Sequence, residues 1–273
     1  MGHELWFTGI LNTIFGPAVA ALLMATSRLP HMGFARPADQ LHPIPDYVAG
    51  EILVLLIIIV AAIILRTRLS MENPGKFQMA MEVFVEFTRN LVDEVIGHGG
   101  RRYVAMIGTI GLFVLICNIE GLVPTLITPT AIVYVPLGCA VAAFVHYNYH
   151  GVRVKGIFGY VRHLSGPMLA IAWLFLPIEV FSNFLRMLSL TARLWGNMLA
   201  SVTVPGLFMS LGLNFYGYLT HAGYAFLSPV GLIIAIFAPV IFMALHVFEA
   251  FLQAYVFMIL PALYISLATS EEH

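Results

Sequence analysis

The sequence predicts an all-α, polytopic membrane protein, because it is strongly apolar, sparsely charged and divided into long uncharged stretches. Hydrophobic residues make up 60% of the 273 positions and charged residues only 10%, with a mean hydropathy of +0.92. An ordinary soluble domain carries about 25% charged residues. Several windows reach or approach the roughly 20 apolar residues that a helix needs to cross a bilayer. We therefore expect a single membrane domain over residues 1–273, with no soluble catalytic domain.

Composition also argues against several functions. The net charge of −1 and the lack of a dense basic cluster speak against binding to nucleic acid. Cys117 and Cys139 lie in apolar windows without the spacing of a redox pair or a metal site, so we interpret them as packing residues. We expect neither a cofactor nor a bound metal.

The N-terminal part, residues 1–47, is expected to lie on the outer side of the membrane. Residues 5–26 are apolar but interrupted by glycines and a proline, and they lack the positively charged start of a secretory signal. We interpret them as an interfacial helix. Residues 28–46 contain four prolines and are predicted to form an extended loop.

The first membrane span is predicted at residues 48–66, followed by an amphipathic surface helix at residues 70–97. Arg66 and Arg68 stand at the end of the span, and cytoplasmic loops are enriched in Lys and Arg, so this end should face the cytoplasm. In the second segment, apolar residues recur every three or four positions while charged residues occupy the other faces. That pattern indicates a helix lying on the membrane surface.

Residues 103–150 are predicted to form a transmembrane hairpin with spans at 103–123 and 131–149. The turn between the spans is uncharged, whereas five basic residues flank the hairpin, namely Arg101, Arg102, Arg153, Lys155 and Arg162. By the same charge rule, the turn faces outward and the basic residues face the cytoplasm, the last three of them in a loop. The N-terminus is then outside and the C-terminus cytoplasmic.

The last part, residues 167–269, holds two apolar stretches at 167–211 and 228–269, each about twice the length of a perpendicular span. Each stretch either hides two short spans or forms one long helix. Neither contains a charged turn at its midpoint, which favours two long tilted helices. Four prolines are expected to bend or unwind them: Pro177, Pro205, Pro239 and Pro261.

Arg193 stands in the middle of the first of these helices, in the segment Ser189-Leu-Thr-Ala-Arg-Leu-Trp-Gly-Asn197. A cation at the centre of a bilayer costs from about 2.5 to more than about 10 kcal/mol, depending on the method. No acidic residue lies one helical turn away, so another helix or another subunit must supply an acid, or water must reach the cation.

Polar side chains form a stripe along each long helix. On the first helix they are spaced three or four residues apart and share one face: Glu179, Ser182, Arg186, Ser189, Arg193 and Asn197. On the second helix the same spacing relates His246, Glu249 and Gln253. If the helices run antiparallel, the two stripes can face each other and line a water path.

Several of these side chains also have a purely structural interpretation. Arg186 can pair with Glu179, seven residues away on the same face. His246 and Glu249 can satisfy each other, but a histidine beside an acid at membrane depth is also a proton relay, since imidazole titrates near physiological pH. Glu120, near the outer end of its span, can simply lie at the membrane interface.

A fixed cation suits one mechanism of ion transport. The guanidinium of an arginine does not release its proton in the working pH range. A carboxylic acid buried in lipid stays protonated, whereas the same acid beside a fixed cation releases its proton. Acids that move past Arg193 would therefore alternate their protonation, and the cation would block direct flow between two aqueous paths.

From about residue 42 onward, the chain resembles subunit a of the F-type ATP synthase. Four segments carry the resemblance: Pro74-Gly-Lys-Phe-Gln78, Asn118-Ile-Glu-Gly-Leu-Val-Pro124, the segment around Arg193, and Leu252-Gln-Ala-Tyr-Val-Phe257. The resemblance implies a bacterial inner-membrane stator subunit that makes no ATP itself. Its expected partners are the c-ring of the rotor, the peripheral-stalk subunit b and the lipid bilayer.

The resemblance also implies roles for individual residues. Arg193 would face the rotor-ring carboxylate, with Asn197 and Gln253 as polar neighbours at the rotor face. The alternative interpretation of the two amide side chains is structural, as hydrogen bonds between helices. The family usually pairs an acid with a histidine, one at the position of Val202 and the other at the position of His246. Because this chain has a valine at 202, we expect the pair to be rebuilt as His246 with Glu249.

Two other classes of protein fit the charges less well. A secondary transporter could bind an anionic substrate at Arg193, but transporters are usually built from internal repeats, and the sequence shows none. A scaffold protein could pair its arginines with acids of partner helices. The sequence does not distinguish H⁺ from Na⁺ as the transported ion.

Overall fold

The computed structural model confirms an all-α membrane protein. It describes residues 6–26, 43–97, 99–122, 129–164, 172–222, 224, 226 and 228–269. Within these ranges the chain forms α-helices, joined in two places by short 3-10 turns, and no strand. Four helical segments are long and apolar enough to cross a membrane: 46–67, 100–120, 173–221 and 228–267.

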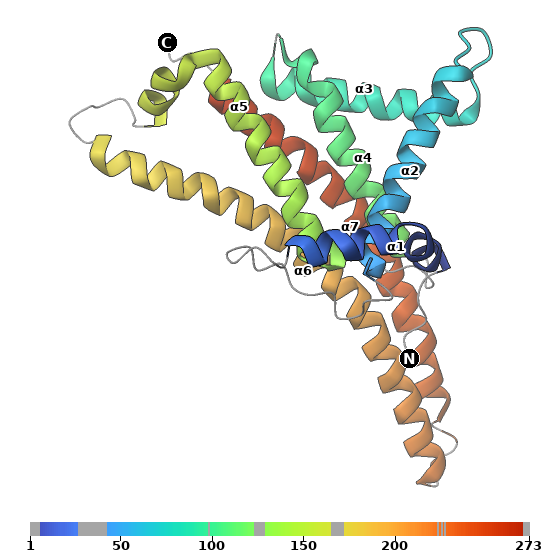
Figure 1. The fold of residues 1–273 in the computed structure, drawn as a ribbon. Coiled ribbons are helices and arrows are strands. Elements are labelled where there is room, and N and C mark those ends of the chain that lie inside the picture. Colours follow the sequence, from blue (N-terminus) through green and yellow to red (C-terminus); the bar gives the residue numbers. More distant parts are fainter. Residues whose placement is uncertain are drawn as a thin grey trace.

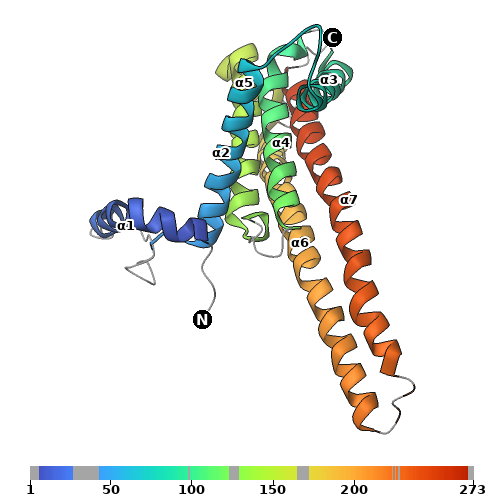
Figure 2. The same ribbon diagram turned by 90° about the vertical axis from the view of Figure 1, so that its right-hand side faces the viewer.

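The first helix, α1 (Trp6–Thr26), runs crosswise to the upright helix α2 (Asp46–Thr67), as Figure 2 shows. This is the placement that the interfacial interpretation requires. The side chain of Asn12 donates to the backbone carbonyl of Ile44 at 3.1 Å and accepts from its backbone N–H at 2.9 Å. The pair fixes α1 to the start of α2. Most of the predicted loop at 28–46 lies outside the described residues.

The amphipathic helix α3 (Lys76–Ile96) lies crosswise at the opposite end of α2 (Figures 1 and 2). It ends at Gly97 and is followed by Gly99, with φ of 79° and 104°, a left-handed region that glycine enters readily. The chain then passes through the 3-10 turn η1 (Gly100–Tyr103) into α4 (Val104–Glu120).

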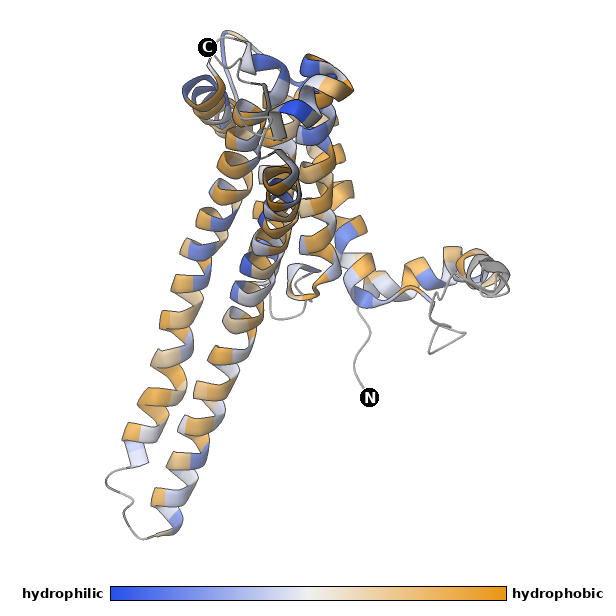
Figure 3. Cartoon of the chain, turned by 90° about the vertical axis from the view of Figure 1, so that its left-hand side faces the viewer, coloured by the Kyte–Doolittle hydropathy of each residue, from blue (hydrophilic) through white to orange (hydrophobic). Residues whose placement is uncertain are grey.

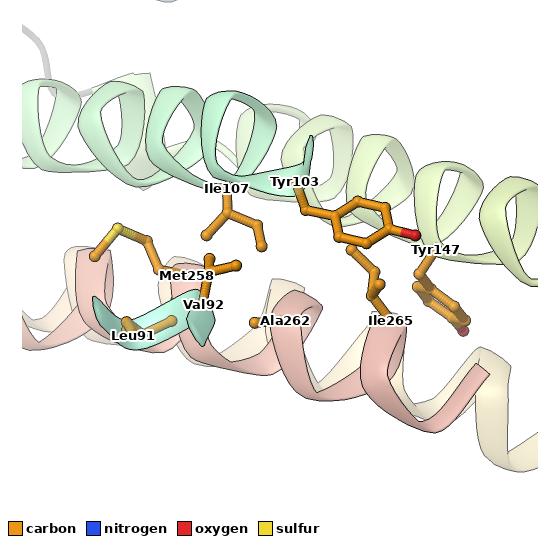
Figure 4. Close-up of a cluster of buried hydrophobic side chains, with 8 residues drawn as sticks. All are labelled: Leu91, Val92, Tyr103, Ile107, Tyr147, Met258, Ala262 and Ile265. Carbon is orange, nitrogen blue, oxygen red and sulfur yellow. The ribbon is translucent and has the colours of Figure 1, made fainter. Parts of the chain in front are cut away.

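One buried cluster joins α3 to the rest of the protein. Figure 4 shows side chains from α3, η1, α4, α5 (Tyr134–Leu164) and the last helix meeting there: Leu91, Val92, Tyr103, Ile107, Tyr147, Met258, Ala262 and Ile265. A surface helix is therefore held to the spans by its own apolar face.

Helix α5, which follows the 3-10 turn η2 (Pro129–Ala131), is longer than the span predicted at 131–149. The basic residues assigned to a loop lie in its helical continuation, which corrects that prediction. A helix needs no apolar residues to continue into water, and the break comes instead at Gly156, whose φ is 71°. Most of the predicted outward turn, residues 124–129, lies outside the described part of the chain.

The longest elements are α6 (Ala172–His221) and α7 (Ser228–Thr269), which form an antiparallel pair inclined to α2 and α4 (Figures 1 and 2). This confirms two long tilted helices, and both run through their prolines without unwinding. Helix α6 was predicted to end at residue 211 but ends at His221, so this prediction was wrong by ten residues. Its uncharged extension packs along α7, and the joined end projects beyond the other helices.

Two glycines allow this extension to pack closely. A Cβ atom on Gly212 would lie 2.5 Å from the backbone nitrogen of Ala235, and one on Gly231 would lie 2.6 Å from that of Tyr216. Backbones approach this closely only where side chains are absent or small. Helix α7 also packs against α3, α4 and α5, so it is the central helix of the protein.

Candidate functional site

Helix α6 presents two different faces around the arginine predicted to be functional. Leu190, Leu194 and Met198 are buried in a cluster with residues of α4, α5 and α7. Arg193 and Ser189 lie on the opposite, exposed face. The exposed surface of α6 around them also carries large apolar side chains, among them Leu188, Trp195 and Leu199, and Figure 3 shows α6 and α7 as mainly hydrophobic with isolated polar turns.

Arg193 has no partner for its charge in the part of the chain that the structure describes. Among the described residues, the structure gives Arg193 no hydrogen bond and no ion pair. An exposed cation in a wide apolar face is a site for an acid of another molecule or for water.

Arg186, seven residues earlier, is held within the protein. Its guanidinium donates to Glu179 at 3.4 Å and to the side-chain oxygen of Asn183 at 3.3 Å, and it lies 5.2 Å above the ring of Tyr264. The hydroxyl of Tyr147 donates to the same Asn183 oxygen at 3.0 Å. Arg186 and Glu179 therefore form a structural network, which favours the structural interpretation of this pair.

The pairing of α6 with α7 places two predicted polar residues at one level. Phe208 packs on Phe242 with ring centroids 5.1 Å apart, and Leu194 shares a buried cluster with Phe257. In an antiparallel pair, this register sets Asn197 level with Gln253. Gln253 is only 1% exposed.

The side-chain oxygen of Gln253 is buried without a hydrogen-bond partner in the described structure, whereas Asn197 is half-buried at the edge of the α6–α7 contact. The two polar stripes thus meet near this level. They do not face each other along their whole length, because Arg193 points outward while His246 and Gln253 point into the protein.

His246 is buried and bonded to a distant part of the chain. Its Nε2 lies 3.0 Å from the backbone oxygen of Asn118, at the end of α4. A carbonyl oxygen only accepts, so Nε2 carries the proton and Nδ1 is left as the acceptor. The structure gives no hydrogen bond or ion pair between His246 and Glu249, both of which it describes. Glu249 is half-buried one turn further along α7.

Two further polar side chains are buried near the end of α4. Glu120 is 8% exposed and both of its oxygens lack a hydrogen-bond partner among the described residues. Asn118, whose backbone oxygen contacts His246, accepts a side-chain hydrogen bond from Thr130 at 2.8 Å, and its own amide nitrogen is unpartnered. An acid two residues from an asparagine inside an apolar helix was the available signal.

The described structure thus buries polar side chains on two packed helices, Asn118 and Glu120 on α4 and His246 and Gln253 on α7. Buried polar atoms without a protein partner are normally satisfied by water. The described residues include no group of three or more side chains suited to hold a metal ion. Helix α7 packs in turn against α6, which carries the exposed Arg193.

The fold and these groups define a class, an all-helical multi-pass membrane subunit with buried polar side chains and an exposed arginine on its longest helices. The chain belongs to the ATP synthase A chain family, which it matches over residues 49–266. It is thus a non-catalytic, proton-translocating subunit of the membrane sector of ATP synthase.

Known relatives support this membership over the full length of the chain. It is 38% identical over 273 residues, covering all of both chains, to ATP synthase subunit a of Koribacter versatilis. It is 40% identical over 241 residues, 88% of this chain and 94% of the relative, to the subunit a of Solibacter usitatus. The subunit a of Desulfosudis oleivorans is 34% identical over 200 residues, or 73% and 78% of the two chains.

Proposed function

We propose that this subunit is the stator of a rotary proton path, with Arg193 as the fixed cation that faces the carboxylates of the c-ring. The observation that carries the proposal is the exposure of Arg193 in an apolar face without an acid partner among the described residues. A ring of buried acids moving past this face would supply the missing partner. Each acid would release its proton beside Arg193 and take one up elsewhere.

The outer half-channel in this proposal follows the buried polar side chains of α4 and α7. Glu120 and Asn118 stand where water would enter from the outside, and His246 passes protons toward Gln253 and the rotor face. Glu249 is half-buried three residues from His246, and it is the acid with which the imidazole would exchange a proton. Asn197 lies level with Gln253 at the edge of the rotor face and would hydrogen-bond to water there.

Orientation and partners follow from the charge pattern and the family. The end that carries α3 and the basic residues would face the cytoplasm, and the joined end of α6 and α7 would point outward. The c-ring would pack on the exposed apolar face around Arg193, and subunit b would hold the protein to the peripheral stalk. A proton that moves down the membrane potential would release about 2.3 kcal/mol per 100 mV, and this free energy would drive rotation.

The test is ATP-driven acidification of inverted membrane vesicles that carry the assembled complex with Arg193→Ala. We expect pumping to be abolished while the amount of assembled complex is unchanged. The matched control is Arg186→Ala, the same change on the same helix at an arginine that is already paired, and this variant should keep most of its pumping. Pumping that survives Arg193→Ala would overturn the proposal.

A further inference from the structure

The junction of α2 and α3 encloses a hollow that the proton path does not use. The hollow measures about 670 Å³, within the range of small-molecule sites. One wall is the apolar side of α2, including Leu56, Val60 and Ile64, and the other is the start of α3. Gly75, Lys76, Phe77 and Gln78 all line it, so most of the segment Pro74–Gln78, one of the four that carry the family resemblance, borders this hollow.

Two cations stand at the rim of the hollow, where the apolar span ends. Arg68 is the residue that closes α2, and Lys76 is the first residue of α3. Both are exposed, and the structure shows neither of them in an ion pair within the part of the chain it describes. The phosphate groups of a bilayer lie where the apolar part of a span ends, and these two cations stand at the end of the apolar run of α2.

Gln78 fastens the connection between α2 and α3. Its side-chain oxygen accepts from the backbone N–H of Ser70 at 3.1 Å, and its nitrogen donates to the Ser70 carbonyl at 3.0 Å. The same nitrogen donates to Glu82 at 2.7 Å, so this nearby carboxylate is engaged; Glu82 lines a neighbouring hollow and not this one. Arg68 and Lys76 stand at the two ends of the fastened connection, and both line the hollow.

We propose that this hollow binds one anionic phospholipid, with its phosphate between Arg68 and Lys76 and an acyl chain along α2. Charge complementarity selects the occupant, because an apolar wall that ends in two unpaired cations matches an acyl chain that ends in a phosphate. A second hollow, between α3 and α4, repeats the arrangement with Arg89 and Arg101. The proposal concerns a face remote from Arg193 and does not rest on the proton path.

The test uses the purified ATP synthase complex, stripped of lipid in detergent and then titrated with dioleoyl phosphatidylglycerol or dioleoyl phosphatidylcholine. Bound lipid is counted by native mass spectrometry. Because each cation near a membrane surface contributes about one kcal/mol, Arg68→Gln with Lys76→Gln should weaken phosphatidylglycerol binding roughly 30-fold at this site. Binding of the zwitterionic lipid should not change.

Two further comparisons make the result specific. Arg153→Gln with Arg162→Gln removes the same charge from exposed basic residues that line neither hollow, and should leave lipid binding unchanged. Ala61→Trp fills the hollow without changing charge and should also displace the lipid, whereas Ala62→Trp, on the exposed side of α2, should not. The proposal would be overturned if neither Arg68→Gln with Lys76→Gln nor Ala61→Trp reduced the amount of bound phosphatidylglycerol. That result would indicate that a partner helix occupies the hollow.

Discussion

Two arginines on one helix show how far identical side chains can differ in role. Arg186 and Arg193 share a stripe and a spacing, and the sequence left the role of Arg186 open between pairing and solvation. The structure separates the two by their neighbours, since Arg186 meets Asn183, Glu179 and a tyrosine ring, while Arg193 meets none of these. The ring comes from α7, 78 positions further along the chain, so spacing alone could not have supplied this distinction.

The ion pair of Arg186 with Glu179 should be a weak contributor to stability. About a third of each side chain is exposed, at 30% and 38%, and exposed pairs contribute roughly 0.2–1 kcal/mol. We expect the double-mutant cycle of Glu179→Gln and Arg186→Gln to give a coupling energy below about 1 kcal/mol. The effects of the two single variants and of the double variant are measured by heat inactivation of the solubilised complex. A larger coupling would mean that the pair is desolvated in the assembly.

Glu249 offers a sharper test of the inner part of the site. Its carboxylate is half-buried one turn from His246, whose free Nδ1 is available to exchange a proton. Glu249→Gln keeps the size of the side chain and removes its titration, so proton pumping should fall about tenfold or more, a modest share of the effect of an acid or base in proton transfer. The measurement is the initial rate of acidification at equal complex content.

The control for this variant is Glu94→Gln, the same chemical change on the exposed face of α3, and it should pump normally. If Glu249→Gln pumps at the unmodified rate, then His246 exchanges its proton with water or with Glu120 instead. That outcome would remove Glu249 from the path and leave the role of Arg193 untouched.

At the scale of elements, hydropathy predicted which segments are helices better than where they end. The span predicted at 48–66 forms α2 (Asp46–Thr67), because its length follows directly from the apolar run. The ends of α5 and α6 were missed because no hydropathy rule governs a helix beyond the bilayer. The break in α5 is at Gly156, which has a left-handed conformation, and the extension of α6 depends on close packing against α7. A single sequence reveals neither.

The close packing of α6 on α7 predicts a difference between two glycines on the same helix. A Cβ on Gly212 would meet the backbone of Ala235, whereas one on Gly206 would meet nothing within 4 Å. Gly206→Ala should be neutral or stabilise the helix by up to about 1 kcal/mol, and Gly212→Val should force the helices apart.

The separation can be read from a disulfide engineered between Phe208→Cys and Phe242→Cys, in a background where Cys117 and Cys139 are replaced by alanine. Crosslinking should be efficient with Gly206→Ala and should fall severalfold with Gly212→Val. Equal crosslinking in both backgrounds would show that the two helices are not in close contact at this level in the assembled complex.

At the scale of the whole molecule, the polar path is assembled from segments that are far apart in sequence. His246 lies 128 positions from the carbonyl that it contacts, and Thr130 reaches Asn118 across the outward turn. The sequence predicted the individual stripes, since spacing along one helix is a local property. It could not predict that Glu120 would be buried, because that depends on how α4 packs against the other helices.

The arrangement of the helices makes a prediction about sidedness. The connection between α2 and α3 and the joined end of α6 and α7 lie at opposite ends of the protein (Figures 1 and 2). Single cysteines at these places, Glu72→Cys and His221→Cys, both replace exposed residues. A membrane-impermeant maleimide should label position 72 in inverted vesicles and position 221 in intact spheroplasts, because basic residues gather at the α3 end and such residues face the cytoplasm.

Labelling of both cysteines from one side would contradict the crossing of the membrane by α6 and α7, and with it the path from one aqueous side to the other. Labelling of each from the side opposite to that expected would keep the path but reverse it, so that Glu120 would open to the cytoplasm. Arg193 would remain the fixed cation between the two aqueous sides, since a guanidinium does not release its proton in the working pH range. The position of the basic residues at the α3 end favours the first outcome.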